Sequence, residues 1–112
     1  KRKKKMKNEI VTADMVVEKL LLGGFKLLDA DEQGERHFSR HTIVGAPPDA
    51  DGDKVYVHAT VAASGLCGMA VVSPTPHGWA NIEYTDVDPI FFHRNLKTME
   101  RQVIGAWREL AD

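Results

Sequence analysis

The 112-residue chain contains a single cysteine, few aromatic residues (7%) and no long apolar segment. One cysteine excludes a disulfide framework, and it excludes a zinc site built from thiolates alone. No segment approaches the roughly 18 apolar residues of a membrane-spanning helix, and nothing resembles the apolar core of a signal peptide. We therefore expect a cytoplasmic protein that does not insert into a membrane, and a chain of this length fits one domain.

Charge is nearly balanced overall but is divided unevenly along the chain. The sequence has 15 Lys and Arg against 16 Asp and Glu, and six of the basic residues fall within residues 1–7. Taking these six away leaves 9 basic and 16 acidic residues from Asn8 onward, a net charge of −7. Because like charges repel and bury no apolar surface, we expect residues 1–8 to be a disordered basic arm before a single α+β domain at residues 9–112. Alternatively, residues 1–5 are not native, because Met6 resembles a natural start, and the protein is then plainly acidic and suited to a basic protein partner.

The first part of the domain is predicted to be a helix followed by strands. Thr12 can cap the helix, and Gly23-Gly24 can end it. Its apolar face comprises Met15, Val16, Val17, Leu20 and Leu21. Segments rich in β-branched and aromatic residues then alternate with turn formers, such as those of 46–53. The predicted strands are 25–28, 35–45, 54–63, 69–73 and 79–85.

The last element is predicted to be one amphipathic helix. Asp88 is a typical N-cap, and Pro89 suits the first helical position, where an N–H would have no intrahelical partner. Steps of three and four residues place six apolar side chains on one face: Phe92, Leu96, Met99, Val103, Trp107 and Leu110. The expected partner is the sheet face that carries Phe38, Val44, Val55, Val57 and Val61. The sequence therefore predicts an α+β fold with an N-terminal helix, an antiparallel meander of four to five strands, and a C-terminal helix packed on one sheet face.

A basic ridge is predicted on the opposite face of that helix. Its members are Arg94, Lys97, Arg101 and Arg108. Lys97 and Arg101 are like charges four residues apart, which costs a few tenths of a kcal/mol, so an anionic partner would be one reason to keep them. Together with the N-terminal arm, the basic ridge would suit a nucleic-acid backbone. An ordinary solvated helix face has the same composition, and no nucleic-acid-binding motif accompanies it.

Three of the five histidines fall in the predicted hairpin of 35–45 and 54–63. If the hairpin closes symmetrically about residues 49 and 50, His41 faces His58 and Ser39 faces Thr60, while His37 lies on the same sheet face. The imidazoles of His37, His41 and His58 could then bind zinc and leave an open coordination position. This metal site depends on the assumed register, and the alternative is a half-exposed polar sheet face.

The sequence offers no catalytic constellation and no cofactor motif. Cys67 lies near glycines, but no histidine is placed beside it by spacing, and a lone cysteine at a strand edge is typical of a small buried apolar residue. A phosphate-binding glycine loop and a nucleophile elbow are both absent from the sequence. We therefore expect a protein that is not an enzyme.

By elimination, these features favour a small acidic protein-binding module, of the kind found among inhibitors, immunity proteins, secretion chaperones and phage or plasmid accessory proteins. We expect binding through an exposed sheet face or the proline-rich turn before Trp79, with Tyr56, His77 and Trp79 as contact residues. The alternatives are nucleic-acid binding through the basic ridge and metal binding through the histidines. The expected partner is another protein, and the choice between monomer and homodimer stays open.

Overall fold

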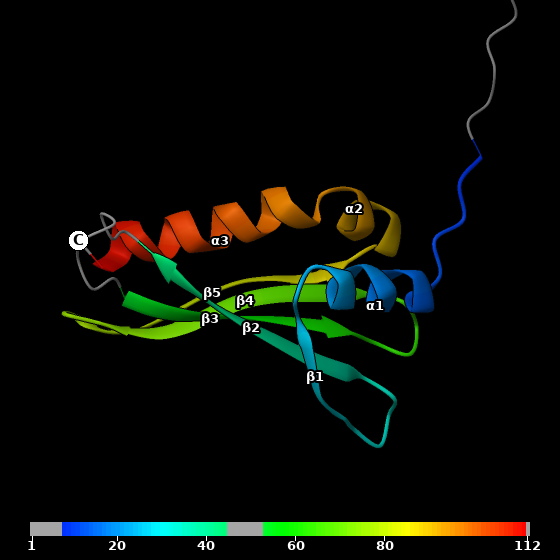
Figure 1. Ribbon diagram of the computed structural model, residues 1–112, viewed down its shortest axis with the longest axis horizontal. Coiled ribbons are helices and arrows are strands. Elements are labelled where there is room, and N and C mark those ends of the chain that lie inside the picture. Colours follow the sequence, from blue (N-terminus) through cyan, green and yellow to red (C-terminus); the bar gives the residue numbers. More distant parts are fainter. Residues whose placement is uncertain (1–7, 45–52, 112) are drawn as a thin grey trace, which may run out of the picture.

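The computed structural model describes residues 8–44 and 53–111, with the backbone alone for 42–44, 53 and 54. Its elements, shown in Figure 1, are α1 (Ala13–Leu22), β1 (Lys26–Ala30), β2 (Arg36–Val44), β3 (Asp53–Val61), β4 (Cys67–Thr75), β5 (Gly78–Val87), α2 (Pro89–Arg94) and α3 (Leu96–Ala111). This is the predicted α+β class, with an N-terminal helix, a five-stranded antiparallel sheet and two C-terminal helices on the sheet. The predicted basic arm, except for Asn8, and the predicted turn at 46–53, except for the backbone of Asp53, lie outside the described residues.

The first helix begins where the sequence predicts. The side-chain oxygen of Thr12 accepts a hydrogen bond from the backbone N–H of Met15 at 3.2 Å. The chain leaves α1 through Gly24, whose φ of +93° favours glycine. Of the five residues predicted on the apolar face, only Val16 and Leu20 are buried. Because α1 is short and lies at the border of the core, it buries fewer apolar side chains than its sequence pattern indicates.

Each strand of the sheet pairs with the next strand along the chain, in the order β1-β2-β3-β4-β5. Side chains alternate between two faces, as β3 illustrates: Val55, Val57 and Val61 are buried, whereas Tyr56 and His58 on the opposite face are not. We call the first face the inner face and the second the outer face. The pairing is interrupted by irregularities between Leu27 and Asp29 in β1, and between Cys67 and Met69 in β4.

The core lies between the inner face and the helices. Figure 1 shows α3 along one side of the sheet, with α2 continuing toward α1. One buried cluster joins Val16 and Leu20 of α1, Phe92 of α2, and Leu96, Met99, Val103 and Trp107 of α3 to Phe38, Val55, Val57, Val61, Met69 and Val71 of the sheet. Each fully buried side chain of this size contributes about 1.5–3 kcal/mol to folding through removal from water. Of the five residues predicted on the sheet face beneath the C-terminal helix, four belong to this cluster. The fifth, Val44, has a side chain that lies outside the described part of the structure.

The predicted C-terminal helix is divided into two. At Asn95 the backbone leaves helical geometry (φ −116°, ψ 23°), and the side-chain amide donates a hydrogen bond to the carbonyl of Phe91 at 3.0 Å. Asparagine competes with the backbone in this way, which weakens a helix interior. The prediction that Leu110 lies in the apolar contact is wrong, because Leu110 is 54% exposed. Periodicity identifies the face of a helix but does not show where the surface beneath it ends.

The register of the β2–β3 hairpin also differs from the assumed one. His41 pairs with Tyr56 and Ser39 pairs with His58, so the predicted pairing of His41 with His58 is wrong. Each described residue of β2 pairs with a β3 residue two positions earlier in the sequence than assumed. Because side chains alternate with a period of two, this two-residue shift leaves every histidine on its predicted face but changes its neighbours.

Candidate functional site

The outer face is a sheet surface that no described element covers. Its regular positions come from alternate residues of four strands, with Leu28 of β1 beside them, and the buried apolar cluster includes none of these side chains. These positions are His37, Ser39 and His41 on β2, Tyr56, His58 and Thr60 on β3, Ala70, Val72 and Pro74 on β4, and Trp79, Asn81 and Glu83 on β5. All described helices contact the opposite side, so no described element covers this face.

Large apolar side chains gather on the outer face, and we call them the outer apolar patch: Leu28 (58% exposed), Tyr56 (46%), Val72 (43%) and Trp79 (75%). Tyr56 stands beside His41, with ring centroids 5.9 Å apart, and with Leu28 it lines a shallow hollow of about 260 Å³. The β3–β4 register, continued by one residue, places Val72 next to Tyr56.

Trp79 begins the β5 side of the β4–β5 turn, where it pairs with Pro74. The turn is ordered by Thr75: its hydroxyl donates to the carbonyl of Gly78 at 2.7 Å and accepts the N–H of His77 at 3.0 Å. His77 is exposed at the tip of this turn. The structure thus places Trp79 and His77 together, and Tyr56 on the same face but two strands away.

An acidic hollow of about 400 Å³ lies at the other end of the outer face. Its walls include His58 and Thr60, and the absence of a side chain at Gly68 leaves room between them and β5. It is lined by the carboxylates of Glu35, Glu83 and Asp86 and by no lysine or arginine of the described residues. The hollow is therefore suited to a cationic group.

Cys67 also borders this hollow, but its thiol belongs to the core. The side chain is 2% exposed, and the thiol donates to the carbonyl of Gly65 at 3.2 Å. Burial, and to a lesser extent the charge of Asp88, raises the pKa of the thiol from 9.0 to about 11. A nucleophilic cysteine needs the reverse shift and a neighbouring base. His58 is on the opposite face of the sheet, so the two do not form a catalytic pair.

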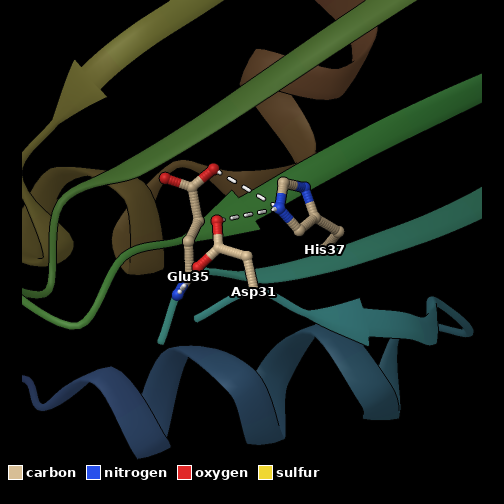
Figure 2. A group of neighbouring side chains, drawn as sticks. All are labelled: Asp31, Glu35 and His37. Atoms are coloured by element: carbon tan, nitrogen blue, oxygen red, sulfur yellow. Dashed lines mark hydrogen bonds and ion pairs between the residues drawn. The ribbon is translucent and has the colours of Figure 1, made fainter. Parts of the chain in front are cut away.

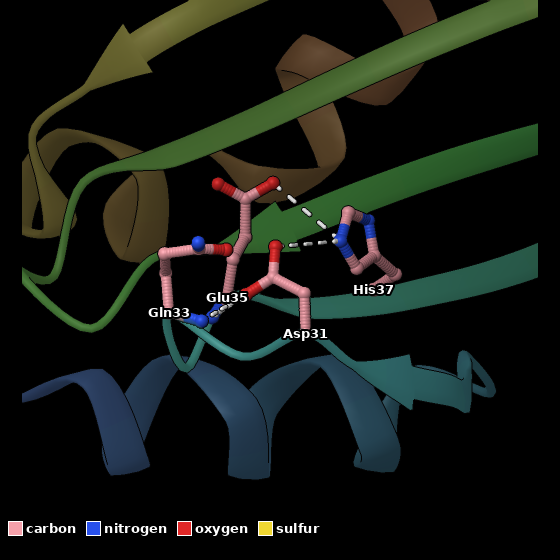
Figure 3. Close-up of polar contacts among 4 residues, drawn as sticks. All are labelled: Asp31, Gln33, Glu35 and His37. Atoms are coloured by element: carbon pink, nitrogen blue, oxygen red, sulfur yellow. Dashed lines mark hydrogen bonds and ion pairs between the residues drawn. The ribbon is translucent and has the colours of Figure 1, made fainter.

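A group of three metal-ligating side chains lies at the β1–β2 turn. Figure 2 shows Asp31, Glu35 and His37 converging, and their ligand atoms all lie within 4.8 Å of one another. The Nε2 atom of His37 is 3.6 Å from Oε1 of Glu35 and 3.8 Å from Oδ2 of Asp31. The other carboxylate oxygen of Asp31 accepts the backbone N–H groups of Gln33 and Glu35, at 3.0 and 2.9 Å, which fixes the turn (Figure 3). We call Asp31, Glu35 and His37 the turn triad.

The structure does not bring His37, His41 and His58 into one ligand group. Among the described residues, the group close enough to share an ion combines His37 with Asp31 and Glu35. The sequence prediction did not include these carboxylates, because it combined the three imidazoles across the hairpin. The available signal was local: three carboxylate residues, Asp31, Glu32 and Glu35, precede His37 within a single tight turn.

The predicted basic ridge is not a single free surface. Arg94 forms an ion pair with Glu9, and Arg108 is exposed near the other end of α3. Lys97 and Arg101 instead line a cavity beside α1 and β2.

Among the described residues, no helix is both long enough and apolar enough to cross a membrane.

Comparison of the chain with models of protein families, with curated proteins and with solved structures found no match.

Proposed function

We propose that this protein is a non-enzymatic protein-binding module that docks through the outer apolar patch. The observation that supports this function best is the exposure of Trp79, 75% of whose surface is open on a sheet face that no described element covers. Tryptophan and tyrosine are the residues most enriched at the energetic centres of protein interfaces. The predicted contact residues Tyr56, His77 and Trp79 all border this surface.

Trp79 can supply a large share of the binding energy of such an interface. Covering the exposed part of Trp79 removes roughly 150 Å² from water, which corresponds to about 4 kcal/mol before other costs. Because the residue stands on a paired strand next to an ordered turn, little conformational freedom is lost when a partner docks. This rigidity favours Trp79 as the principal anchor.

The charge around the patch specifies the chemistry of the partner. Glu35, Glu83 and Asp86 line the acidic hollow at the end of the same face. A partner that offers an apolar side chain to Trp79 and a lysine or arginine to this hollow would be complementary, and the charges would also accelerate association. The proposed partner is thus a basic protein surface, and the module is comparable in kind to an inhibitor, immunity protein or chaperone.

The test compares variants on opposite faces in an affinity pull-down from the native host, followed by measurement of Kd for the recovered protein. We expect Trp79→Ala to weaken binding by about 30-fold and Tyr56→Ala by about 5-fold, since interface aromatics cost about 1–2 kcal/mol or more on truncation. Leu110→Ala removes an exposed apolar residue from α3 and should leave Kd unchanged.

Two results would contradict the proposal. One is recovery of nucleic acid with no stoichiometric protein. The other is a protein partner whose Kd is insensitive to both Trp79→Ala and Tyr56→Ala. Sedimentation of the purified protein identifies the case in which the partner is a second copy, because Trp79→Ala would then convert a dimer to a monomer.

A second candidate function, metal binding, is supported by the turn triad. One imidazole and two carboxylates are a ligand set used for zinc and related divalent ions. Two ligands of a tetrahedral zinc ion lie roughly 3.4 Å apart, given metal–ligand distances near 2.1 Å. The distances of 3.6 and 3.8 Å from His37 to the two carboxylates are close to this spacing.

Calorimetric titration with zinc, on protein prepared without a histidine tag, tests this function. We expect about one equivalent to bind, His37→Ala to abolish binding, and His58→Ala to preserve it. Equal binding by the His37→Ala variant, or none by the unmodified protein, would reject the turn triad as a metal site.

A further inference from the structure

The positive charge of the domain is concentrated around one cavity. From Asn8 onward the chain has 9 basic residues in a segment of net charge −7. Four of them, Lys19, Arg40, Lys97 and Arg101, line a cavity of about 490 Å³ on the helix side of the sheet, together with one carboxylate, Glu100. They come from α1, β2 and α3. Their convergence therefore arises from the tertiary fold and not from one solvated helix face.

Two of the four cations are held in place by the protein. The guanidinium of Arg40 pairs with Glu100, donates to the carbonyl of Gly23 at 2.6 Å, and lies 4.9 Å from the centre of the Phe25 ring. The ammonium of Lys19 donates to the backbone carbonyl of His93, a neutral acceptor that leaves its charge uncompensated. These contacts hold Arg40 and Lys19 beside the cavity.

The other two cations are the more exposed pair. Lys97 and Arg101 are exposed, one turn apart on α3, and neither has a hydrogen-bond or ion-pair partner among the described residues. With four cations and one carboxylate, the lining carries a formal net charge of +3. An anion between these two side chains would remove their mutual repulsion.

The cavity also has an apolar wall. Leu22, which is 82% exposed, supplies most of it, whereas Phe25 and Leu96 also line the cavity but are almost fully buried. Its volume lies within the range of small-molecule sites, which combine an apolar lining with a few converging polar groups. Inorganic anions would use only the charged half of such a site.

We propose that this cavity binds a small organic phosphate, with the phosphate between Lys97 and Arg101 and an apolar body against Leu22. Arginine matches the planar pair of oxygens that a phosphate presents, and lysine supplies a point charge. The site is on the opposite side of the sheet from the outer apolar patch, so it is a second activity and does not depend on the proposed protein partner.

Phenyl phosphate, titrated by calorimetry or by amide chemical shifts at low ionic strength, is the probe. We expect saturable binding that Arg101→Glu weakens at least tenfold and that Arg108→Glu leaves within twofold of the unmodified protein. Arg108 is the matched control, because it is the same residue type, exposed on the same helix and outside the cavity. Inorganic phosphate should bind at least fivefold more weakly, because it lacks the apolar body. Trp79→Ala should bind phenyl phosphate normally.

Three results would overturn the proposal: no saturable binding of phenyl phosphate, equal losses in Arg101→Glu and Arg108→Glu, or equal affinity for inorganic phosphate. A single-stranded oligonucleotide provides one further arm. Tighter binding of the oligonucleotide, with equal dependence on Arg101 and Arg108, would assign the charges to a polyanion-binding helix face instead of a cavity. Circular dichroism of each variant confirms that it is folded before its affinity is compared.

Discussion

Substitution of Gly68 by alanine should destabilise the protein, although alanine is normally the better residue in a folded chain. Gly68 is buried in β4 between β3 and β5, where a Cβ atom would lie 2.8 Å from the hydroxyl of Thr60 and 3.1 Å from the carbonyl oxygen of Tyr84. The Thr60 side chain can rotate away. The carbonyl of Tyr84 cannot, because it belongs to a strand held by the β4–β5 pairing.

Two opposing effects set the change in the free energy of unfolding. Overpacking of a buried site costs about 1–3 kcal/mol, and the loss of glycine's freedom in the unfolded chain returns about 0.4–1 kcal/mol. We expect Gly68→Ala to lower the free energy of unfolding by about 1–2 kcal/mol, or the melting temperature by roughly 4–8 °C. Adding Thr60→Ala should recover about 0.5–1 kcal/mol, because it relieves one of the two contacts.

Urea unfolding followed by the fluorescence of buried Trp107 measures these differences. Gly105→Ala is the matched control. A Cβ at this position of α3 meets nothing within 4 Å, so the same substitution should stabilise the protein by about 0.5–1 kcal/mol. The reasoning is refuted if Gly68→Ala is as stable as the unmodified protein, or if the two substitutions shift stability in the same direction.

Three further predictions concern buried and capping groups. Because the pKa of Cys67 is raised from 9.0 to about 11, the folded state holds the thiol proton more tightly. This preference for the protonated thiol stabilises the folded protein by up to about 2–3 kcal/mol. The stabilisation should be complete below pH 9 and be lost as the pH rises toward 11. Urea titrations of the unmodified protein and of Cys67→Ala over this pH range should show the loss as a change in the difference between their free energies of unfolding. Asp88 accepts the N–H of Phe91 at 2.8 Å, so Asp88→Ala should cost about 1 kcal/mol and Asp88→Asn much less; equal costs would contradict a capping role. Arg40→Ala leaves the carboxylate of Glu100, 13% exposed, without its ion-pair partner and should cost about 2 kcal/mol in thermal unfolding, a loss that Glu100→Gln should partly relieve.

Much of the architecture could be predicted because local and periodic signals agree with the tertiary structure. Thr12 and Asp88 cap the helices as predicted. The valines at alternate positions of β3 identify the sheet face that packs on the helices. The division of the last helix at Asn95 was missed, because one unfavourable residue is a weak signal within a strong apolar period. The exposure of Leu110 was missed because it depends on how far the neighbouring surface extends.

The candidate sites were harder to predict because they depend on distance in space. Trp79 and His77 could be identified since they flank one turn. The neighbours of His41 depend on the strand register, and a shift of two residues replaced His58 by Tyr56 without changing any face. The cavity of Lys19, Arg40, Lys97 and Arg101 combines three elements, so no sequence window contains it.

The order of the strands has a consequence for folding kinetics. Every ladder of the sheet closes between consecutive strands, so the chain entropy lost in forming each ladder is small and the sheet can assemble by successive hairpins. The contact of Lys19 with His93 instead spans 74 positions of sequence, and it can form only after the intervening strands have drawn the two ends together. We therefore expect α1 to dock late in folding and to detach first in unfolding, while the meander persists as the slowest-exchanging part of the molecule.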